Sequence, residues 1–339
     1  MVNPMLECAV ISFCYNQTDP SGGRAQVAIA EVRDDKEWVR FQWLRPLGNL
    51  GVDAATIQMF PPYPHALRKQ IEEEGLQATI AQQGRQALYV SNTFPVEHDG
   101  PVAIFGDVHG DHGKLLKLIK KIQEKHGDIP LYTAGDLIDR GPHSRSVIDT
   151  CIKHNIRGVM GNHDQWLHQY ISGFGFDTMA LHDVMGGKAT LRSYGLEDFS
   201  LRAIENELCK HIPNSHFDWV YNMLPYMKIV VAGHTYWLVH AGLGHSDTQP
   251  FWEKAHGDED SMMAHLCRSN PAALQWGHIQ KLPEGAFEFP SGSTVVMGHR
   301  VRWRGAEVED HVICLDTGCG FPKGRLTAIV LPQGELISV

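Results

Sequence analysis

The sequence lacks the features that mark secreted, membrane-spanning and nucleic-acid-binding proteins. Its seven cysteines are scattered and form no CxxC pair, which excludes a disulfide framework and indicates reduced thiols. There is no basic segment followed by an apolar core at the start, and no apolar run long enough to span a bilayer. A formal charge of −9 argues against a nucleic-acid surface. We therefore expect a cytoplasmic protein without a membrane or nucleic-acid partner, whose oligomeric state the sequence leaves open.

The 339 residues fall into two parts of different pattern. Residues 1–98 predict an N-terminal β-rich module, with strands at Cys8–Phe13, Ala25–Val32 and Trp38–Trp43 and a helix at His65–Glu74. No chemical motif occurs there, so a structural or partner-binding role is favoured, with substrate or partner selection as the hypothesis. Residues 99–339 form the second predicted domain.

From Pro101 onward, strands and helices alternate along the chain. Apolar runs at Pro101–Phe105, Leu131–Ala134 and Ile156–Met160 predict three buried strands, and the helix after the second is expected to begin with Ser144 as its N-cap. The helix after the third is predicted at Gln165–Ile171. Consecutive units of this kind give a parallel sheet whose polar loops all lie at the carboxyl ends of strands.

The second half of this domain shows more antiparallel patterning. A hairpin is predicted within Lys228–Val239, followed by strands at Thr294–Met297 and His311–Leu315. A last hairpin joins Leu326–Leu331 to Glu335–Val339. Two sheets packed face to face with helices outside would bury both apolar faces, so the fold class is α/β with two facing mixed β-sheets flanked by helices.

Six side chains of the kinds that bind metals follow the predicted strands: Asp107, His109, Asp136, Asn162, His240 and His299. Carboxylate, imidazole and amide donors without cysteine suit divalent ions, with Mn²⁺ expected and Fe or Zn as alternatives. If Asp136 bridges two ions, Asp107 and His109 complete one site, while the remaining three complete the other. Two such ions about 3.5–4 Å apart clamp a phosphoryl group and lower the pKa of a shared water.

Five short motifs carry a resemblance to a known family. GDVHG (106–110), GDLIDRG (135–141), GNHD (161–164), VHAGL (239–243) and MGHR (297–300) stand in the order found in metallophosphoesterases of the phosphoprotein phosphatase superfamily. MGGKATLRSYG (185–195) and LDTG (315–318) are similar to its bacterial branch, which includes serine/threonine protein phosphatases and symmetrical diadenosine tetraphosphatases. The resemblance covers residues 101–339 and implies the calcineurin-like α/β/β/α sandwich with two bound divalent ions.

The resemblance also implies roles for three further residues. Arg140 would hold phosphate oxygens, and His163, oriented by Asp139, would protonate the leaving oxygen. Direct attack by metal-bound hydroxide, without a phosphoenzyme, is the expected mechanism. The family's bacterial members have an arginine after a Leu-Trp pair, whereas this chain has Leu274-Gln-Trp-Gly-His278 there. Arg268, Arg300 and Arg302 are the candidates to replace that arginine.

Three functions fit these motifs. A phosphoserine/phosphothreonine protein phosphatase is placed first, and a dinucleoside polyphosphate hydrolase of the diadenosine tetraphosphatase kind is the alternative. The expected partner is thus a phosphorylated protein or a small phosphoester. A non-catalytic metal-binding module is disfavoured, because a decayed site would miss ligands and all of the expected positions are filled.

Overall fold

The computed structural model describes residues 7–15, 24–33, 36–44, 96–171, 176–221, 223–277, 279 and 281–339. The chain divides into two compact units, one holding residues 1–92 with two short later segments, the other holding most of residues 93–339. In the first unit, β1 (Glu7–Tyr15), β2 (Arg24–Arg33) and β3 (Lys36–Leu44) form an antiparallel sheet in that order. These are the three predicted strands. The predicted helix at His65–Glu74 lies outside the described residues.

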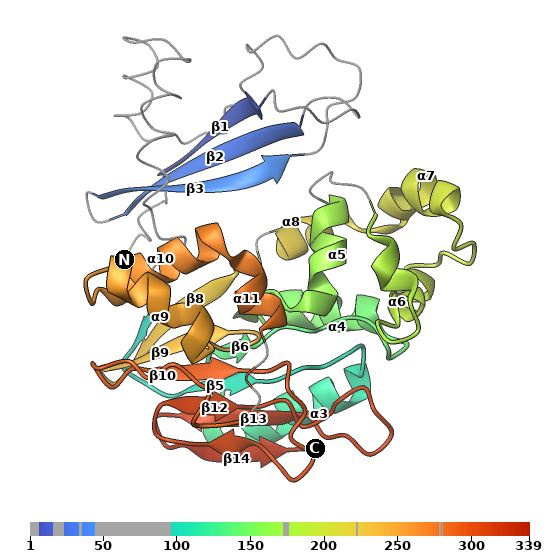
Figure 1. Ribbon diagram of the computed structural model, residues 1–339. Helices are drawn as coiled ribbons and strands as arrows, with labels where there is room; N and C mark the ends of the chain where they lie inside the picture. Colours follow the sequence, from blue (N-terminus) through green and yellow to red (C-terminus); the bar gives the residue numbers. More distant parts are fainter. Residues whose placement is uncertain are drawn as a thin grey trace. The chain divides into compact units, whose positions relative to one another are not determined.

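The first sheet of the second unit has five strands in the order β14-β13-β5-β6-β7 (Figure 1). Parallel strands β5 (Val102–Phe105), β6 (Leu131–Thr133) and β7 (Arg157–Gly158) are joined by antiparallel β13 (Thr327–Leu331) and β14 (Glu335–Ser338). Strand β7 is shorter than the predicted Ile156–Met160. The reason is that Val159 bridges to Leu224, whose carbonyl accepts the N–H of Met160, so the chain leaves the ladder early.

The second sheet has six strands in the order β11-β12-β10-β9-β8-β4. Their bounds are Glu307–Val308 (β11), Val312–Cys314 (β12), Thr294–Met297 (β10), His234–Val239 (β9), Tyr226–Val231 (β8) and Val96–His98 (β4). The predicted hairpin is the antiparallel pair β8–β9, but β9, β10 and β12 are mutually parallel, which the antiparallel patterning did not predict. As a result, the segments that follow these three strands leave the sheet at one edge.

The two sheets pack face to face, as the alternation of side chains along β5 shows. Val102 and Ile104 lie in a buried cluster with residues of the six-stranded sheet, including Ile229 and Leu238. Ala103 and Phe105, which point the other way, lie in the cluster formed with the helices. The predicted arrangement of two facing mixed sheets flanked by helices is therefore confirmed.

Helices cover the outer faces of both sheets (Figure 1). They are α3 (His112–His126), α4 (Ser144–Lys153), α5 (Asn162–Ile171), α6 (Gly187–Ser193), α7 (Leu201–His211), α8 (Asn214–Tyr221), α9 (His245–Lys254) and α11 (Pro271–Trp276), with a short 3₁₀ helix at Thr178–Leu181. Most of α10 (Glu259–Ser269) belongs to the first unit. Helix α5 begins three residues earlier than predicted. Asn162 and His163 therefore stand on its first turn instead of in a loop.

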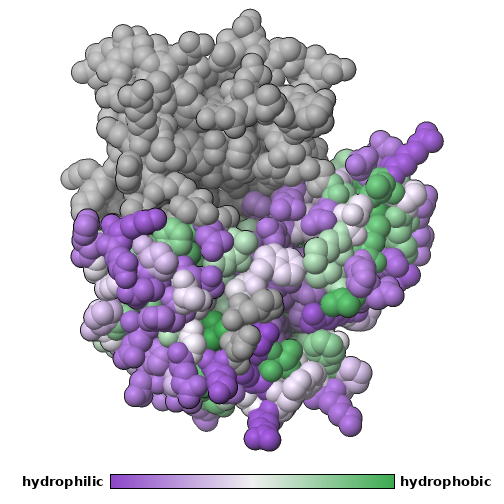
Figure 2. All heavy atoms as spheres, viewed as in Figure 1, coloured by the Kyte–Doolittle hydropathy of each residue, from purple (hydrophilic) through white to green (hydrophobic). Residues whose placement is uncertain are grey.

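The surface of this unit is mainly hydrophilic on the face that Figure 2 shows, with apolar residues interspersed. Among the described residues, no helix combines the length and the apolar character needed to cross a bilayer.

Helix α3 provides a matched test of this packing. Leu118 is fully buried, whereas Leu116 on the same helix is 45% exposed. We expect Leu118→Ala to lower the free energy of unfolding by about 2–5 kcal/mol through lost burial and a cavity. Leu116→Ala should change it by no more than about 0.5 kcal/mol. Urea denaturation of both variants measures this, and equal midpoints would contradict the assignment of the buried face.

Candidate metal centre

The structure brings all nine predicted site residues into one cluster. Each stands just beyond the carboxyl end of a strand: after β5, β6, β7, β9 and β10 come Asp107, Asp136, Asn162, His240 and His299, respectively. His109, Asp139, Arg140 and His163 follow in the same segments. These strands belong to both sheets, so the cluster lies at the carboxyl ends of strands from the two facing sheets.

Asp136 lies at the middle of this cluster. The donor atoms of Asp136, His109 and His163 all lie within 4.8 Å of one another, and so do those of Asp136, His240 and His299. One Asp136 oxygen is 3.4 Å from His240 Nε2 and the other is 3.6 Å from His109 Nε2. A carboxylate shared by two donor groups in this way fits the predicted bridge between two ions.

The first of these groups contains His163, which was predicted as the acid, and it lacks Asp107, which was predicted as a ligand. Asp107 and Asn162 lie close to members of the two groups. Asn162 Oδ1 lies 3.0 Å from His240 Nε2 and 2.9 Å from His299 Nδ1. Asp107 Oδ2 lies 3.9 Å from His109 Nε2, and its carboxylate accepts the backbone N–H of His299. Asp107 is thus positioned between the two ends of the cluster.

Two imidazoles are held in the orientation that metal binding requires. His109 Nδ1 donates to the carbonyl of Ile138 at 3.1 Å, and His240 Nδ1 donates to the carbonyl of Ala134 at 2.7 Å. Each bond fixes the tautomer and leaves an Nε2 lone pair facing the carboxylates. Burial also lowers the pKa of His109 well below its usual value, which favours the neutral, ligating form.

Several buried carboxylates in the centre explain electrostatically why it would bind cations. Asp107, Asp136 and Asp316 are each no more than 3% exposed. Burial raises the pKa of Asp107, and the neighbouring carboxylates of Asp316 and Asp136 raise it further. Burial would lower the pKa of His240, but Asp136 and Asp107 raise it to about 10. The centre attracts positive charge strongly, and divalent ions bound to these oxygen and nitrogen donors would supply it.

The predicted pair of His163 and Asp139 forms part of a larger buried network. His163 Nδ1 donates to Asp139 Oδ2 at 3.0 Å, which leaves Nε2 facing the centre. Trp166 Nε1 and Thr190 Oγ1 also donate to the Asp139 carboxylate, at 3.1 and 2.7 Å. Burial raises the pKa of Asp139, and these donors oppose that shift. The carboxylate is thereby fixed in position to orient His163.

Ser144 serves this network and does not cap a helix. The N-cap of α4 is His143, which makes no side-chain capping bond. Ser144 Oγ instead accepts the backbone N–H of Asp139 at 3.2 Å and lies 2.9 Å from Thr190 Oγ1. The N-cap prediction is wrong because this hydroxyl is buried against the loop of Asp139.

Arg140 reaches into the centre from the same loop. Its guanidinium lies 2.6 Å from His109 Nε2 and 3.1 Å from His163 Nε2. It also lies over the ring of Phe321, with the carbon Cζ 4.8 Å from the ring centroid. A planar group with several N–H donors at this point suits the oxygens of a phosphoryl group.

Asp164 is a site residue that the sequence did not single out. It is 2% exposed and accepts the backbone N–H groups of Asp136, Leu137 and Gly161 at 2.7, 3.0 and 3.0 Å. It therefore ties the loop of Asp136 to the start of α5. The sequence signal that could have indicated Asp164 as a site residue was its position after Asn162 and His163 in the GNHD motif.

The backbone of the centre is held in a rarely populated conformation. Five site residues have positive φ: His109 (47°), Asp136 (52°), Asp139 (73°), Arg140 (62°) and His299 (64°). Such residues cost about 1–3 kcal/mol each and persist where the surroundings over-determine them. The concentration of strain in these loops is typical of a functional site.

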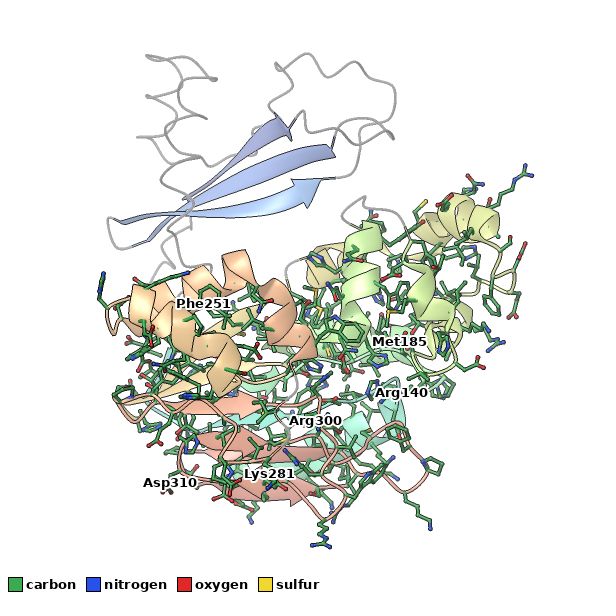
Figure 3. The ribbon with its side chains drawn as sticks, in the orientation of Figure 1. Arg140, Met185, Phe251, Lys281, Arg300 and Asp310 are labelled. Carbon is green, nitrogen blue, oxygen red and sulfur yellow. The ribbon has the colours of Figure 1, made fainter. Side chains whose placement is uncertain are left out.

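The candidates for the missing arginine have different surroundings. Arg302 Nε pairs with Glu307 at 3.2 Å, so it is engaged away from the predicted ligands. Arg300 directly follows His299 after β10, whereas Arg140 follows β6 of the other sheet (Figure 3). The side chain of Arg268 and residue His278 lie outside the described part. Trp276 of the Leu-Gln-Trp segment donates to Gln165 Oε1 at 2.8 Å.

Comparison with known families agrees with the motifs. Residues 100–302 match the model of the calcineurin-like phosphoesterases. The chain belongs to this family. It is thus a hydrolase of phosphoesters, and the phosphoprotein phosphatase superfamily suggested by the motifs is confirmed.

Several relatives of this phosphoesterase are bis(5′-nucleosyl)-tetraphosphatases. An asymmetrical one from Halalkalibacterium halodurans is 28% identical over 255 residues, which are 70% of this chain and 92% of the relative. A symmetrical one from Chromobacterium violaceum is 24% identical over 286 residues, covering 69% of this chain and 93% of the relative. Among solved structures, a protein serine/threonine phosphatase from Saccharomyces cerevisiae is 16% identical, with a TM-score of 0.41 over 81% of this phosphoesterase and 95% of that chain.

The position of Asp136 in both donor groups predicts the effect of its substitution. Asp136→Asn removes the negative charge and one oxygen donor, so the protein should lose both ions together. Elemental analysis after loading with Mn²⁺ measures the metal content. Asp183→Asn, at a side chain that is 97% exposed, is the matched control. A variant that still holds two ions would contradict the bridging role.

Proposed function

We propose that this phosphoesterase uses two divalent ions, Mn²⁺ with Fe or Zn as alternatives, to hydrolyse a dinucleoside polyphosphate. The two-ion proposal rests mainly on the observation that Asp136 belongs to both groups of donors, with the imidazoles of His109 and His240 held around it by bonds to backbone carbonyls. The ligands would be Asp107, His109 and Asp136 for one ion and Asp136, Asn162, His240 and His299 for the other. Bound ions would polarise the phosphoryl group and lower the pKa of water.

The residues of the chain would divide the remaining work. Arg140 would donate to the phosphoryl oxygens and so neutralise charge as the reaction proceeds. Water supplies the oxygen of the new P–O bond, and the bond to the leaving oxygen breaks. His163 would give its Nε2 proton to that oxygen while Asp139 accepts from Nδ1. The proton released from water would restore His163. Because water itself would attack the phosphorus, no phosphoenzyme would form.

The choice of substrate is supported by the relatives. Bis(5′-nucleosyl)-tetraphosphatases align with this chain over 92–93% of their own length. The sequence motifs alone placed a phosphoprotein first, and that reading stays the second candidate. It is favoured by the buried His163–Asp139 pair, since an acid matters most when the leaving group is a poorly activated alkoxide such as that of serine.

The cytoplasmic localisation stays a prediction. It is supported by five cysteines that form no disulfide: Cys151, Cys209, Cys267, Cys314 and Cys319. Cys319 is fully buried, its Sγ donates to the carbonyl of Val108 at 3.1 Å, and burial raises the pKa of its thiol to about 12. This cysteine therefore has a packing role.

Substitution of His163 tests the proposed acid. His163→Asn should retain the metal content and lower turnover of a phosphoserine peptide by about 10²- to 10⁴-fold. The loss should be much smaller for p-nitrophenyl phosphate, whose leaving group needs little protonation. Steady-state kinetics of both substrates measure the difference. Full activity of the variant on the peptide would show that His163 is not the acid.

A substrate panel tests the proposed function as a whole. The Mn²⁺-loaded protein is assayed with diadenosine tetraphosphate, phosphoserine and phosphothreonine peptides, and p-nitrophenyl phosphate. We expect the highest kcat/KM for the dinucleotide. A higher value for a peptide would favour the second candidate, and no hydrolysis of any of them would contradict the phosphoesterase mechanism described above.

A further inference from the structure

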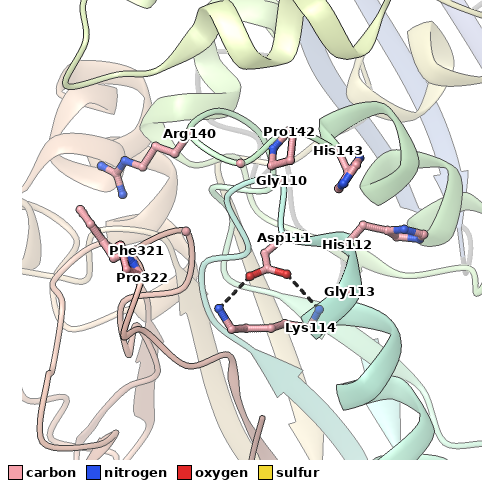
Figure 4. Close-up of a pocket in the computed structure, with 12 residues that line it drawn as sticks. Gly110, Asp111, His112, Gly113, Lys114, Arg140, Pro142, His143, Phe321 and Pro322 are labelled. Atoms are coloured by element: carbon pink, nitrogen blue, oxygen red, sulfur yellow. Dashed lines mark hydrogen bonds and ion pairs between the residues drawn. The ribbon is translucent and has the colours of Figure 1, made fainter.

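A cavity of about 710 Å³ opens beside Arg140. It is lined by residues 110–114, 140–143 and 320–322. The first segment holds the end of the loop after β5 and the first turn of α3, the second follows β6, and the third is part of the loop before β13. Figure 4 shows Arg140, Lys114 and Phe321 around this hollow. Among the lining residues, Arg140 is the only one to which the sequence analysis gave a role in the site.

The cavity adjoins the metal centre directly. The guanidinium of Arg140 contacts Nε2 of both His109 and His163, while the same side chain forms part of the cavity wall. In the lining segment 320–322, a Cβ added to Gly320 would lie 2.5 Å from Cβ of His109. The 320–322 loop therefore rests on the His109 segment. A substrate with its phosphoryl group under Arg140 would extend its remaining part into this hollow.

The lining carries positive charge in a molecule of formal charge −9. Lys114 and Arg140 are the cations, and Asp111 is the carboxylate. The ammonium group of Lys114 donates one hydrogen bond to Asp111 Oδ2 at 2.7 Å. A lysine ammonium has three N–H donors, so the others are left for a ligand. His112 is bonded to Thr150 Oγ1 at 2.9 Å, and burial lowers its pKa, so it adds no charge at neutral pH.

Apart from His143, the rest of the lining consists of glycine, proline and phenylalanine. Phe321 lies between the guanidinium of Arg140, 4.8 Å from its ring centroid, and the ring of Trp303, 5.5 Å away in an edge arrangement. Pro142 and Pro322 complete this wall. A ligand that suits the cavity thus combines anionic groups with a flat apolar part.

We propose that this cavity binds the nucleotide part of the substrate beyond the reacting phosphorus, with Lys114 holding a second phosphate and Phe321 contacting the nucleoside. The proposal rests on the proposed function. A nucleotide is favoured over a phosphopeptide as the ligand. In a nucleotide, the next phosphate is one P–O–P linkage from the reacting phosphate, and its negative charge requires a second cation near Arg140. A peptide backbone beyond a phosphoserine is neutral and has no such requirement.

The test compares Lys114→Gln with Lys120→Gln in the Mn²⁺-loaded full-length protein. Both variants lose one lysine charge on α3, but Lys120 is exposed and lies outside the cavity. The backbone N–H of Lys114 still donates to Asp111 after the substitution, so the helix cap is kept. Loss of a charge-assisted hydrogen bond predicts about a tenfold effect on nucleotide binding.

Two readouts separate this proposal from the proposed function. Lys114→Gln should lower kcat/KM for diadenosine tetraphosphate about tenfold more than for p-nitrophenyl phosphate, and raise the inhibition constant of ADP against p-nitrophenyl phosphate by a similar factor. Lys120→Gln should match the wild type. If the wild type hydrolyses p-nitrophenyl phosphate but Lys114→Gln leaves the ADP constant unchanged, the cavity is not a nucleotide site. A selective loss on a phosphopeptide in place of the dinucleotide would also overturn the proposal. Failure of the wild type on every substrate would instead refute the proposed function.

Discussion

The burial of several carboxylates at one point determines the structure of this phosphoesterase. Five aspartates of the centre are each no more than 3% exposed: Asp107, Asp136, Asp139, Asp164 and Asp316. A buried carboxylate is costly unless hydrogen bonds or cations compensate it. Backbone N–H groups satisfy Asp164, and the side chains of Trp166, Thr190 and His163 satisfy Asp139. For Asp107 and Asp136 the surrounding imidazoles fit a pair of bound cations, so folding and metal binding are expected to be coupled.

The glycines of the motifs follow from the same crowding. A Cβ added to Gly161 would lie 2.1 Å from Asp136 Oδ1, and one added to Gly298 would lie 2.1 Å from Asp107 Oδ1. Any larger residue at either position would displace a carboxylate oxygen. These glycines allow the loops from both sheets to approach the central carboxylates closely enough for one cluster to form.

Much of the fold and most of the site could be predicted, because strands show as apolar runs and the predicted ligands follow them directly. What the sequence did not show depends on tertiary contacts. Ser144 resembles an N-cap locally, but its hydroxyl is used by the loop of Asp139. The parallel order of β9, β10 and β12 arises from pairings between segments far apart in the chain. Asp164 and Thr190 were missed as site residues because their roles lie in hydrogen bonds to other loops.

Diffraction from crystals of the Mn²⁺-loaded protein, with data collected at the manganese absorption edge, tests the central claim most directly. The account predicts two anomalous peaks about 3.5–4 Å apart, both within bonding distance of Asp136. One should lie next to Asp107 and His109, and the other next to Asn162, His240 and His299. A single peak, or two peaks that do not share Asp136, would contradict it.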